Sequence, residues 1–276
     1  MKSSLKIMIL VICLFLISCK QSSKNVAFFE KTEAYDLAKA VEKEDLEKIE
    51  KLIQKNPNLL KVTNDITGSN VLSLALTLEN FESFKKLLEL GADPNFINLL
   101  TKRSVLIDAC TFYDKPEAYT IDLRYIKLLL KEGANPNYAV ESDFTDHDGN
   151  YHTATTALNE ASELDLNMVK VLIKAGADPY KKIGQNEKTP FCSALGGFKN
   201  KFTIVDYYID SLKVNVKAPL STVTRQPSNK IVELFIQDYI RMFFSYEKGT
   251  SGYLKTQKLI HKLENKGVEF ENYNYK

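Results

Sequence analysis

A four-residue motif recurs three times in this chain and constrains its fold more than any other feature. Each copy reads Gly-Ala, then Asp or Asn, then Pro, and each follows a leucine-rich segment. Gly after a helix takes the left-handed conformation that ends it, and the Pro that follows prevents the helix from continuing. A unit that ends in the same way three times predicts a stack of repeats rather than a globule around one active site. The copies lie at 91–94, 133–136 and 176–179.

A second, shorter helical pattern precedes each of these units and recurs four times. In every copy a large apolar residue stands three positions before an alanine, so that both lie on one helix face and a neighbouring helix can approach closely. The pairs are Leu72 with Ala75, Leu106 with Ala109, Leu158 with Ala161, and Phe191 with Ala194. Leu72 and Leu106 are 34 residues apart, and Leu158 and Phe191 are 33 apart. The 52 residues between Leu106 and Leu158 indicate insertions in one repeat.

These motifs resemble the ankyrin repeat family over residues 33 to 270, in which a pattern of two helices and a hairpin recurs at about 33 residues. The resemblance implies an all-α solenoid of about five to six helix-turn-helix units with hairpin loops and degenerate caps at both ends. We expect the ankyrin-repeat domain at 32–276, with a C-terminal helical cap at about 228–276 that includes the run from Ile231 to Ile236. The family's histidine in the first helix is absent, and this should weaken the turn between neighbouring repeats. Ser73, Ile107, Asn159 and Cys192 stand in its place.

The N-terminus has the pattern of a bacterial lipoprotein signal peptide. Two lysines precede an apolar run at 7–17, which is too short to cross a bilayer and suits a signal-peptide core. The run closes with Leu16-Ile17-Ser18-Cys19, which resembles a lipobox and implies cleavage before Cys19 and lipid attachment to its thiol. We therefore expect a signal peptide at 1–18, and the lipidated Cys19 with a flexible tether at 19–31. Lys20 after the cysteine favours the periplasmic side of the outer membrane over the inner membrane.

Charge argues against nucleic acid as a partner. Removing the two lysines of the signal segment leaves 35 basic and 35 acidic side chains, hence no formal net charge. Proteins that bind nucleic acid usually carry a basic excess or stripe. The partners expected are a protein and, through the lipid, a membrane.

The repeat with insertions is one candidate for the binding surface. It gains residues at 113–119 and extends its hairpin into a finger at 138–155, in which Asp148-Gly149 marks a turn. Extended loops on one face of a stack are common binding sites, although drift in a tolerant loop explains them equally well. Within the finger, Tyr151, His147 and His152 are the candidate contact residues.

Aromatic residues after the Gly-Ala motifs supply a second candidate. Phe96 and Tyr138 occupy equivalent positions, and Tyr180 lies one position earlier in its unit. Their rings either form a ladder that contacts the partner or pack one hairpin against the next. Buried aromatic residues often supply much of the affinity of an interface.

No catalytic motif stands out, and we expect neither an enzyme nor a cofactor. The chain lacks a Gly-x-Ser-x-Gly elbow and a phosphate-binding glycine loop. The prediction is a membrane-anchored lipoprotein that binds a protein through its concave face and hairpin fingers. Two variants of this role are an immunity-type inhibitor of a toxin and a scaffold for an envelope enzyme. The alternative of another class is a metal-dependent enzyme that uses His147 and His152, with Asp143, Asp146 and Asp148 of the same finger as further possible metal ligands.

Overall fold

The computed structural model describes residues 25–111, 122–197 and 201–275. The expected signal peptide at 1–18, the lipobox with Cys19, and the insertion at 113–119 lie outside these residues and stay predictions. The chain divides into two compact units. Unit 1 contains residues 1–105 and 127–134, and unit 2 contains 106–126 and 135–276. The division passes through two helices, α6 (Val105–Ala109) and α7 (Leu123–Lys131).

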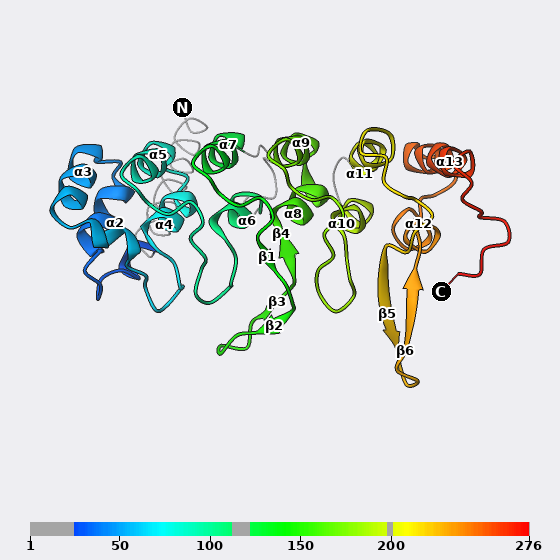
Figure 1. Cartoon of the computed structure of the whole chain (residues 1–276), viewed down its shortest axis with the longest axis horizontal. Coiled ribbons are helices and arrows are strands. Elements are labelled where there is room, and N and C mark those ends of the chain that lie inside the picture. Colours follow the sequence, from blue (N-terminus) through cyan, green and yellow to red (C-terminus); the bar gives the residue numbers. More distant parts are fainter. Residues whose placement is uncertain (1–24, 112–121, 198–200, 276) are drawn as a thin grey trace, which may run out of the picture. The chain divides into compact units, whose positions relative to one another are not determined.

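Unit 1 contains two helical pairs that pack side by side. α2 contacts α3 and α4 contacts α5, while α2 also contacts α4 and α3 contacts α5, so the second pair repeats the first (Figure 1). Apolar residues of all four helices, such as Leu37, Ile49, Leu72 and Phe84, are fully buried between them. The elements are α2 (Tyr35–Glu42), α3 (Leu46–Lys55), the 3-10 helix η1 (Pro57–Lys61), α4 (Val71–Thr77) and α5 (Phe81–Glu89).

Polar side chains of the second helical pair donate hydrogen bonds to the carbonyl groups at the end of α2 in the first pair. The Asn80 amide donates to the carbonyls of Val41 at 2.8 Å and Glu42 at 3.1 Å, and Ser83 Oγ donates to Val41 at 3.1 Å. The last carbonyls of a helix have no partner within it. Here the neighbouring repeat supplies the donors, and the two helical pairs are therefore joined by hydrogen bonds as well as by apolar contacts.

Unit 2, taken by itself, is also built of packed helical pairs and has more elements. In Figure 1, α9, α11 and α13 form one row, α8, α10 and α12 form a second row, and the hairpins project beyond the second row. α10 contacts α8, α11 and α12, and α9 contacts α8 and α11. The helices are α8 (Ala157–Leu164), α9 (Leu166–Lys174), α10 (Pro190–Gly196), α11 (Lys201–Asp206) with the π-helical η2 (Tyr207–Ser211), α12 (Ile236–Phe243) and α13 (Ser251–Glu264).

The motifs found in the sequence occupy equivalent places, as predicted. Leu72, Leu106, Leu158 and Phe191 are each the second residue of a short helix and each at most 2% exposed. The three motif glycines follow α5, α7 and α9 and have φ angles of 95°, 95° and 91°. This left-handed conformation ends each helix at little steric cost only because the residue is Gly.

Three antiparallel two-stranded sheets form the hairpins of unit 2. β1 pairs with β4 and β2 pairs with β3, which together build the extended finger, and β5 pairs with β6. The strands are β1 (Ala139–Val140), β2 (Phe144–Thr145), β3 (Tyr151–His152), β4 (Thr155–Thr156), β5 (Ser221–Arg225) and β6 (Lys230–Leu234).

Neighbouring loops within each unit are joined by a backbone hydrogen bond. In unit 1, Leu99 N donates to the Gly68 carbonyl at 3.1 Å. In unit 2, Gly184 N donates to the Glu141 carbonyl at 2.9 Å, and Thr222 N donates to the Asn186 carbonyl at 2.8 Å. In each case the later loop donates and the earlier loop accepts. This is a direct consequence of stacking repeats in register.

Two expectations about the ends of the fold are wrong. Residues 230–234 form strand β6 rather than the start of the helical cap, because they pair with β5 in a hairpin, and the helix begins only at Ile236. At the other end, Val26 and Phe29 are 4% and 1% exposed, so the packed fold includes part of the expected tether at 19–31.

The expected loss of hydrogen bonding at the absent histidine is only partial. Asn159 Nδ2 donates to Ser193 Oγ at 3.3 Å, and Cys192 Sγ donates to the Leu220 carbonyl at 2.9 Å, and each bond joins one repeat to the next. Ser73 Oγ, by contrast, is buried with no hydrogen-bond partner in the part of the chain that the structure describes. Asn and Cys therefore replace the histidine in unit 2.

The contact between α8 and the end of α10 can be tested at two adjacent glycines. A Cβ on Gly197 would lie 2.8 Å from the backbone oxygen of Glu163, whereas a Cβ on Gly196 would have no heavy atom within 4 Å. The φ of Gly197 is −59°, which alanine adopts freely, so only the contact opposes substitution. We expect Gly197→Ala to lower the free energy of unfolding by about 1–3 kcal/mol.

Gly196→Ala is the matched control, expected to be neutral or to stabilise by up to about 1 kcal/mol. Urea unfolding followed by circular dichroism measures both variants. A Gly197→Ala variant as stable as the wild-type chain would contradict the close approach of α8 and α10.

Candidate functional site

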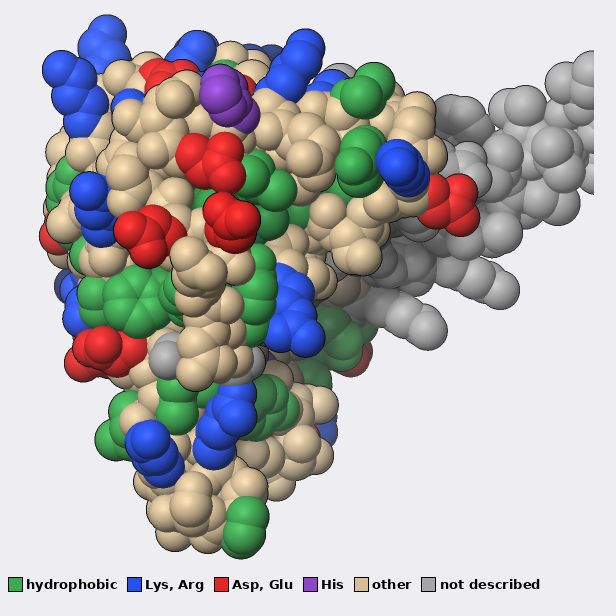
Figure 2. All heavy atoms as spheres, turned by 90° about the vertical axis from the view of Figure 1, so that its right-hand side faces the viewer, with side chains coloured by type: hydrophobic (Ala, Val, Ile, Leu, Met, Phe, Trp, Pro, Cys, Tyr) green, Lys and Arg blue, Asp and Glu red, His purple; other side chains and the backbone are tan. Residues whose placement is uncertain are grey.

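The exposed large hydrophobic residues are concentrated on the loops and at the C-terminal end. Among the residues that the structure describes, none lies on α3, α5, α7 or α9. The loop positions are Ile66, Ile97 and Leu99 in unit 1 and Tyr151, Tyr180 and Ile231 in unit 2. The C-terminal positions are Met242, Phe243, Tyr246, Leu254 and Tyr275. Figure 2 views this end of unit 2 and shows hydrophobic side chains at the surface beside acidic and basic ones. Exposed apolar side chains therefore occur at the loop tips of each unit and at the end of unit 2, and these are the positions from which a candidate site can be built.

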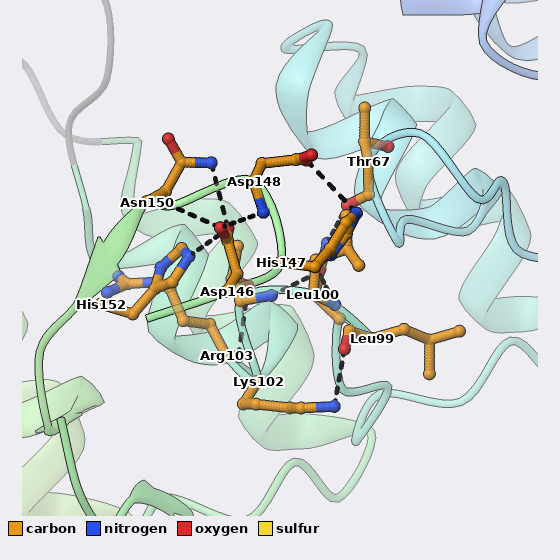
Figure 3. A network of polar contacts seen from close by, with 12 residues as sticks. Thr67, Leu99, Leu100, Lys102, Arg103, Asp146, His147, Asp148, Asn150 and His152 are labelled. Carbon is orange, nitrogen blue, oxygen red and sulfur yellow. Dashed lines mark hydrogen bonds and ion pairs between the residues drawn. The ribbon is translucent and has the colours of Figure 1, made fainter. Parts of the chain in front are cut away.

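The finger, predicted at 138–155 and built in the structure from β1 to β4 (139–156), is ordered at its tip by the carboxylate of Asp146. Asp146 Oδ1 accepts hydrogen bonds from the backbone N–H of Asp148 at 3.0 Å and of Asn150 at 2.8 Å (Figure 3). Its Oδ2 accepts from Asn150 Nδ2 at 3.1 Å and lies 2.9 Å from His152 Nε2. Gly149, with a φ of 83°, completes the turn between β2 and β3. An aspartate that bonds its own backbone in this way fixes a turn without help from the rest of the fold.

The hydrogen bond with His152, followed by the bonds with Asn150 and Asp148, holds the pKa of Asp146 well below its usual range. His152 is held from its other side as well, because its ring stacks on Phe144 with the ring centroids 4.9 Å apart. The carboxylate therefore remains charged, and the turn remains formed, throughout the neutral and mildly acidic range.

A second aspartate positions the exposed aromatic ring of the finger. Asp143 Oδ1 accepts from the backbone N–H of Ala154 at 2.6 Å, and Asp143 Oδ2 accepts from the Tyr151 hydroxyl at 2.8 Å. The bond from Ala154, then that from Tyr151, lowers the pKa of Asp143, and the same contact raises the pKa of Tyr151. The Tyr151 residue remains 65% exposed. It thus presents a large apolar surface whose orientation is already fixed.

The two histidines of the finger have separate partners. His147 is exposed, with Nε2 3.4 Å from Asp148 Oδ2, while His152 is largely covered and pairs with Asp146. Within the described residues no group of three or more His, Cys, Asp or Glu side chains is placed to hold a metal ion. The geometry therefore gives the metal-dependent alternative no support, and it assigns His152 to holding the turn.

The predicted aromatic ladder divides between the two units. Phe96 lies half-buried in unit 1, and Tyr138 and Tyr180 lie in unit 2, the first half-buried and the second 55% exposed. The Tyr180 hydroxyl donates to the Leu212 carbonyl in the following repeat at 3.3 Å. Tyr180 thus links one repeat to the next, while its role in binding stays a prediction.

Two features of this surface were missed in the sequence. Asp143 and Asp146 appeared only as possible metal ligands, although the order Asp146-His147-Asp148-Gly149 is typical of an aspartate that bonds its own turn. Ile231 was assigned to a helix. A proline, serine and asparagine between two runs rich in Thr, Val and Ile would have indicated a hairpin there.

A comparison with solved structures identifies the fold of the chain. The chain is similar to the crystal structure of EF0377, an ankyrin repeat protein, with a TM-score of 0.56 and 20% sequence identity over 84% of this chain and 99% of that chain. A likeness at this identity shows the fold alone. The chain therefore has an ankyrin-repeat fold, and the count of about five to six units stays a prediction. No protein-family model matches the sequence, and no curated protein matches it.

Across residues 25–111, 122–197 and 201–275, none of the helices combines the length and apolar character that a bilayer crossing requires.

The Asp146 carboxylate can be tested by amide hydrogen exchange. In Asp146→Asn the amide presents one oxygen instead of two and adds a donor that faces His152. We expect faster exchange at the backbone amides of Asp148 and Asn150, with little change in the temperature of global unfolding because the finger tip projects from the repeats. Asp148→Asn is the control, since its side chain is exposed.

The pH dependence of this exchange has a definite sign. Because the pKa of Asp146 is lowered in the folded chain, its contribution is complete above the unfolded value of about 4 and is lost only as pH falls through the lower folded value. Protection at Asp148 and Asn150 should therefore persist at about pH 4. Its loss between about pH 5 and 6 would contradict the assignment.

Proposed function

We propose that this chain is a lipid-anchored protein-binding module without catalytic activity, and that the finger and the neighbouring hairpin tips of unit 2 contact its partner. The ankyrin-repeat fold supports a role in protein–protein interaction, because repeats of this kind provide extended binding surfaces and typically carry no catalytic site. The observation that carries the proposal is Tyr151, whose ring is exposed and whose hydroxyl is held by Asp143.

An immobilised aromatic side chain is well suited to binding. Tyrosine brings a large contact area and has only two rotatable side-chain bonds, so little conformational entropy is lost when it is covered. In the finger most of that loss has already occurred on folding, because Asp143 fixes the ring and Asp146 fixes the turn beneath it. The exposed His147 lies at the same tip and is part of the proposed contact surface.

The proposed anchor is the lipid on Cys19. The signal-peptide pattern supports it, as does the lipobox Leu16-Ile17-Ser18-Cys19. Two or three acyl chains hold a protein stably on a bilayer, whereas one chain holds it only marginally. We place the protein at the bacterial cell envelope, on the periplasmic side of the outer membrane, as a proposal that rests on Lys20.

The contact surface can be tested by photo-crosslinking in the cell of origin. A photoreactive amino acid at position 147 should give discrete protein adducts, while the same residue at position 174, on the exposed side of α9, should give none. Adding Tyr151→Ala should reduce the yield at 147 strongly, since truncating a central aromatic residue costs about 2 kcal/mol or more, or about 30-fold in affinity.

Tyr151→Phe tests the aromatic ring separately from its hydroxyl group. It keeps the aromatic surface and removes only the hydrogen bond to Asp143. We expect an intermediate yield. Identical adducts at positions 147 and 174, or a yield at 147 that Tyr151→Ala leaves unchanged, would rule out the finger as the contact surface.

Lipid attachment at Cys19 can be tested separately. Cys19→Ser should abolish labelling by a palmitate analogue and move the protein from the membrane fraction to the soluble fraction. Ser18→Ala is the control, because a small residue before the cysteine is retained and processing should continue. A Cys19→Ser protein that stays labelled would exclude lipidation at this residue.

A further inference from the structure

The outer edge of strand β6 in unit 2 is open. The direction of its backbone groups follows from two bonds on the paired strand. Thr222 N donates to Asn186, away from β6, and Leu234 O accepts from Leu220 N, on the side of β5. Thr222 is the register partner of Glu233. Because residues of an antiparallel pair alternate between facing the partner strand and facing away, the backbone N–H and C=O groups of Glu233 and Ile231 point away from β5.

These outward groups are unused in the described part of the chain. No turn, loop or cap hydrogen bond of the described residues reaches the backbone of Ile231 or Glu233. The residue Ile231 is also 68% exposed, more than any other large hydrophobic residue described. Natural proteins usually protect an edge strand with charge, proline or a bulge, and β6 carries the charged residues Lys230 and Glu233. Between them the apolar Ile231 is exposed, so this edge remains a template for a strand of complementary charge.

The edge also continues an arrangement found within the unit. The finger accepts a backbone bond from Gly184 in the next loop, and that loop accepts one from Thr222 of β5. Strand β6 is the last hairpin strand among the described residues, and only α12 and α13 follow it there. The sheet that β6 forms with β5 has no third strand from the described part of the chain.

We propose that an extended segment of the partner protein adds as a strand to the outer edge of β6. The inference rests on the protein-binding role proposed above and gives the partner a chemical description. Main-chain bonds to Ile231 and Glu233 supply affinity that is independent of sequence, and side chains of alternate residues supply specificity.

Charge at the hairpin tip adds to that description. Arg225 and Lys230 are register partners, so two cations lie opposite each other at the end of the ladder. Like charges in this position repel. No ion pair involves either of them among the residues described. The segment that fits carries an apolar residue beside Ile231 and an acidic residue near Lys230.

The probe is a phage-displayed library of random linear peptides, selected on the full chain in detergent. Selected peptides should combine apolar or β-branched residues with an acidic residue, and their binding should weaken at high salt. Amide hydrogen exchange at Ile231 and Glu233 should be fast in the free protein and slow when a selected peptide is bound, while Val232 changes little.

Two proline variants distinguish binding at the outer edge of β6 from binding at the outer edge of β5. Ile231→Pro removes an outward N–H of β6 and no bond to β5, and it should weaken peptide binding by about tenfold or more. Thr224→Pro makes the same change on the edge of β5 and should alter binding by about twofold at most. Amide hydrogen exchange in the wild-type chain tests whether peptide binds at the edge of β6 even if a proline variant fails to fold.

The proposal is overturned if no peptide is enriched, if Ile231→Pro binds selected peptides as tightly as Thr224→Pro, or if exchange at Ile231 and Glu233 is unchanged by peptide. It is also overturned if the wild-type chain is a dimer that Ile231→Pro converts to a monomer, because a second copy then occupies the edge. Adducts at position 147 would remain in each of these cases, so failure here leaves the proposed function standing.

Discussion

The contact between adjacent helical pairs is the interaction on which the rest of this structure depends. A single pair of helices of seven to ten residues, such as α2 and α3 or α4 and α5, has too little apolar surface to form a core of its own. Each pair is stable because the next one covers it. Alanines such as Ala75, Ala161 and Ala194 are fully buried and let the shorter helices come close. The side chains of Asn80 and Ser83 then donate hydrogen bonds to the last carbonyls of α2 in the preceding pair.

The repeats were readable from sequence because their signals are local and recur. Gly91, Gly133 and Gly176 each stand where a left-handed residue is required, and the spacing from Leu72 to Leu106 gives the period directly. Loops were harder to interpret. The run from Ile231 to Ile236 suits a helix or a strand equally well, and only its pairing with Ser221–Arg225 decides between them. Such pairing depends on residues outside the window that a pattern describes.

The extended finger was predicted from the sequence, but the contacts that hold it were not. Its position followed from the inserted residues between Tyr138 and His152. The roles of Asp143 and Asp146 did not, because a carboxylate has the same appearance in a sequence whether it binds a metal, an arginine or the backbone of its own turn. The effect of losing the expected histidine was predicted correctly at Ser73 but not at Asn159 and Cys192. Asn159 and Cys192 bond to the next repeat through different atoms and with different geometry.

Loops in both units are joined through main-chain atoms, as Leu99 to Gly68 and Thr222 to Asn186 illustrate. Such a bond is indifferent to the side chain of the residue that makes it, except that proline cannot donate. The residues displayed at the hairpin tips are consequently free to diversify while the scaffold beneath them keeps its register. A few substitutions at these tips would therefore change the displayed surface without disturbing the packing of the core.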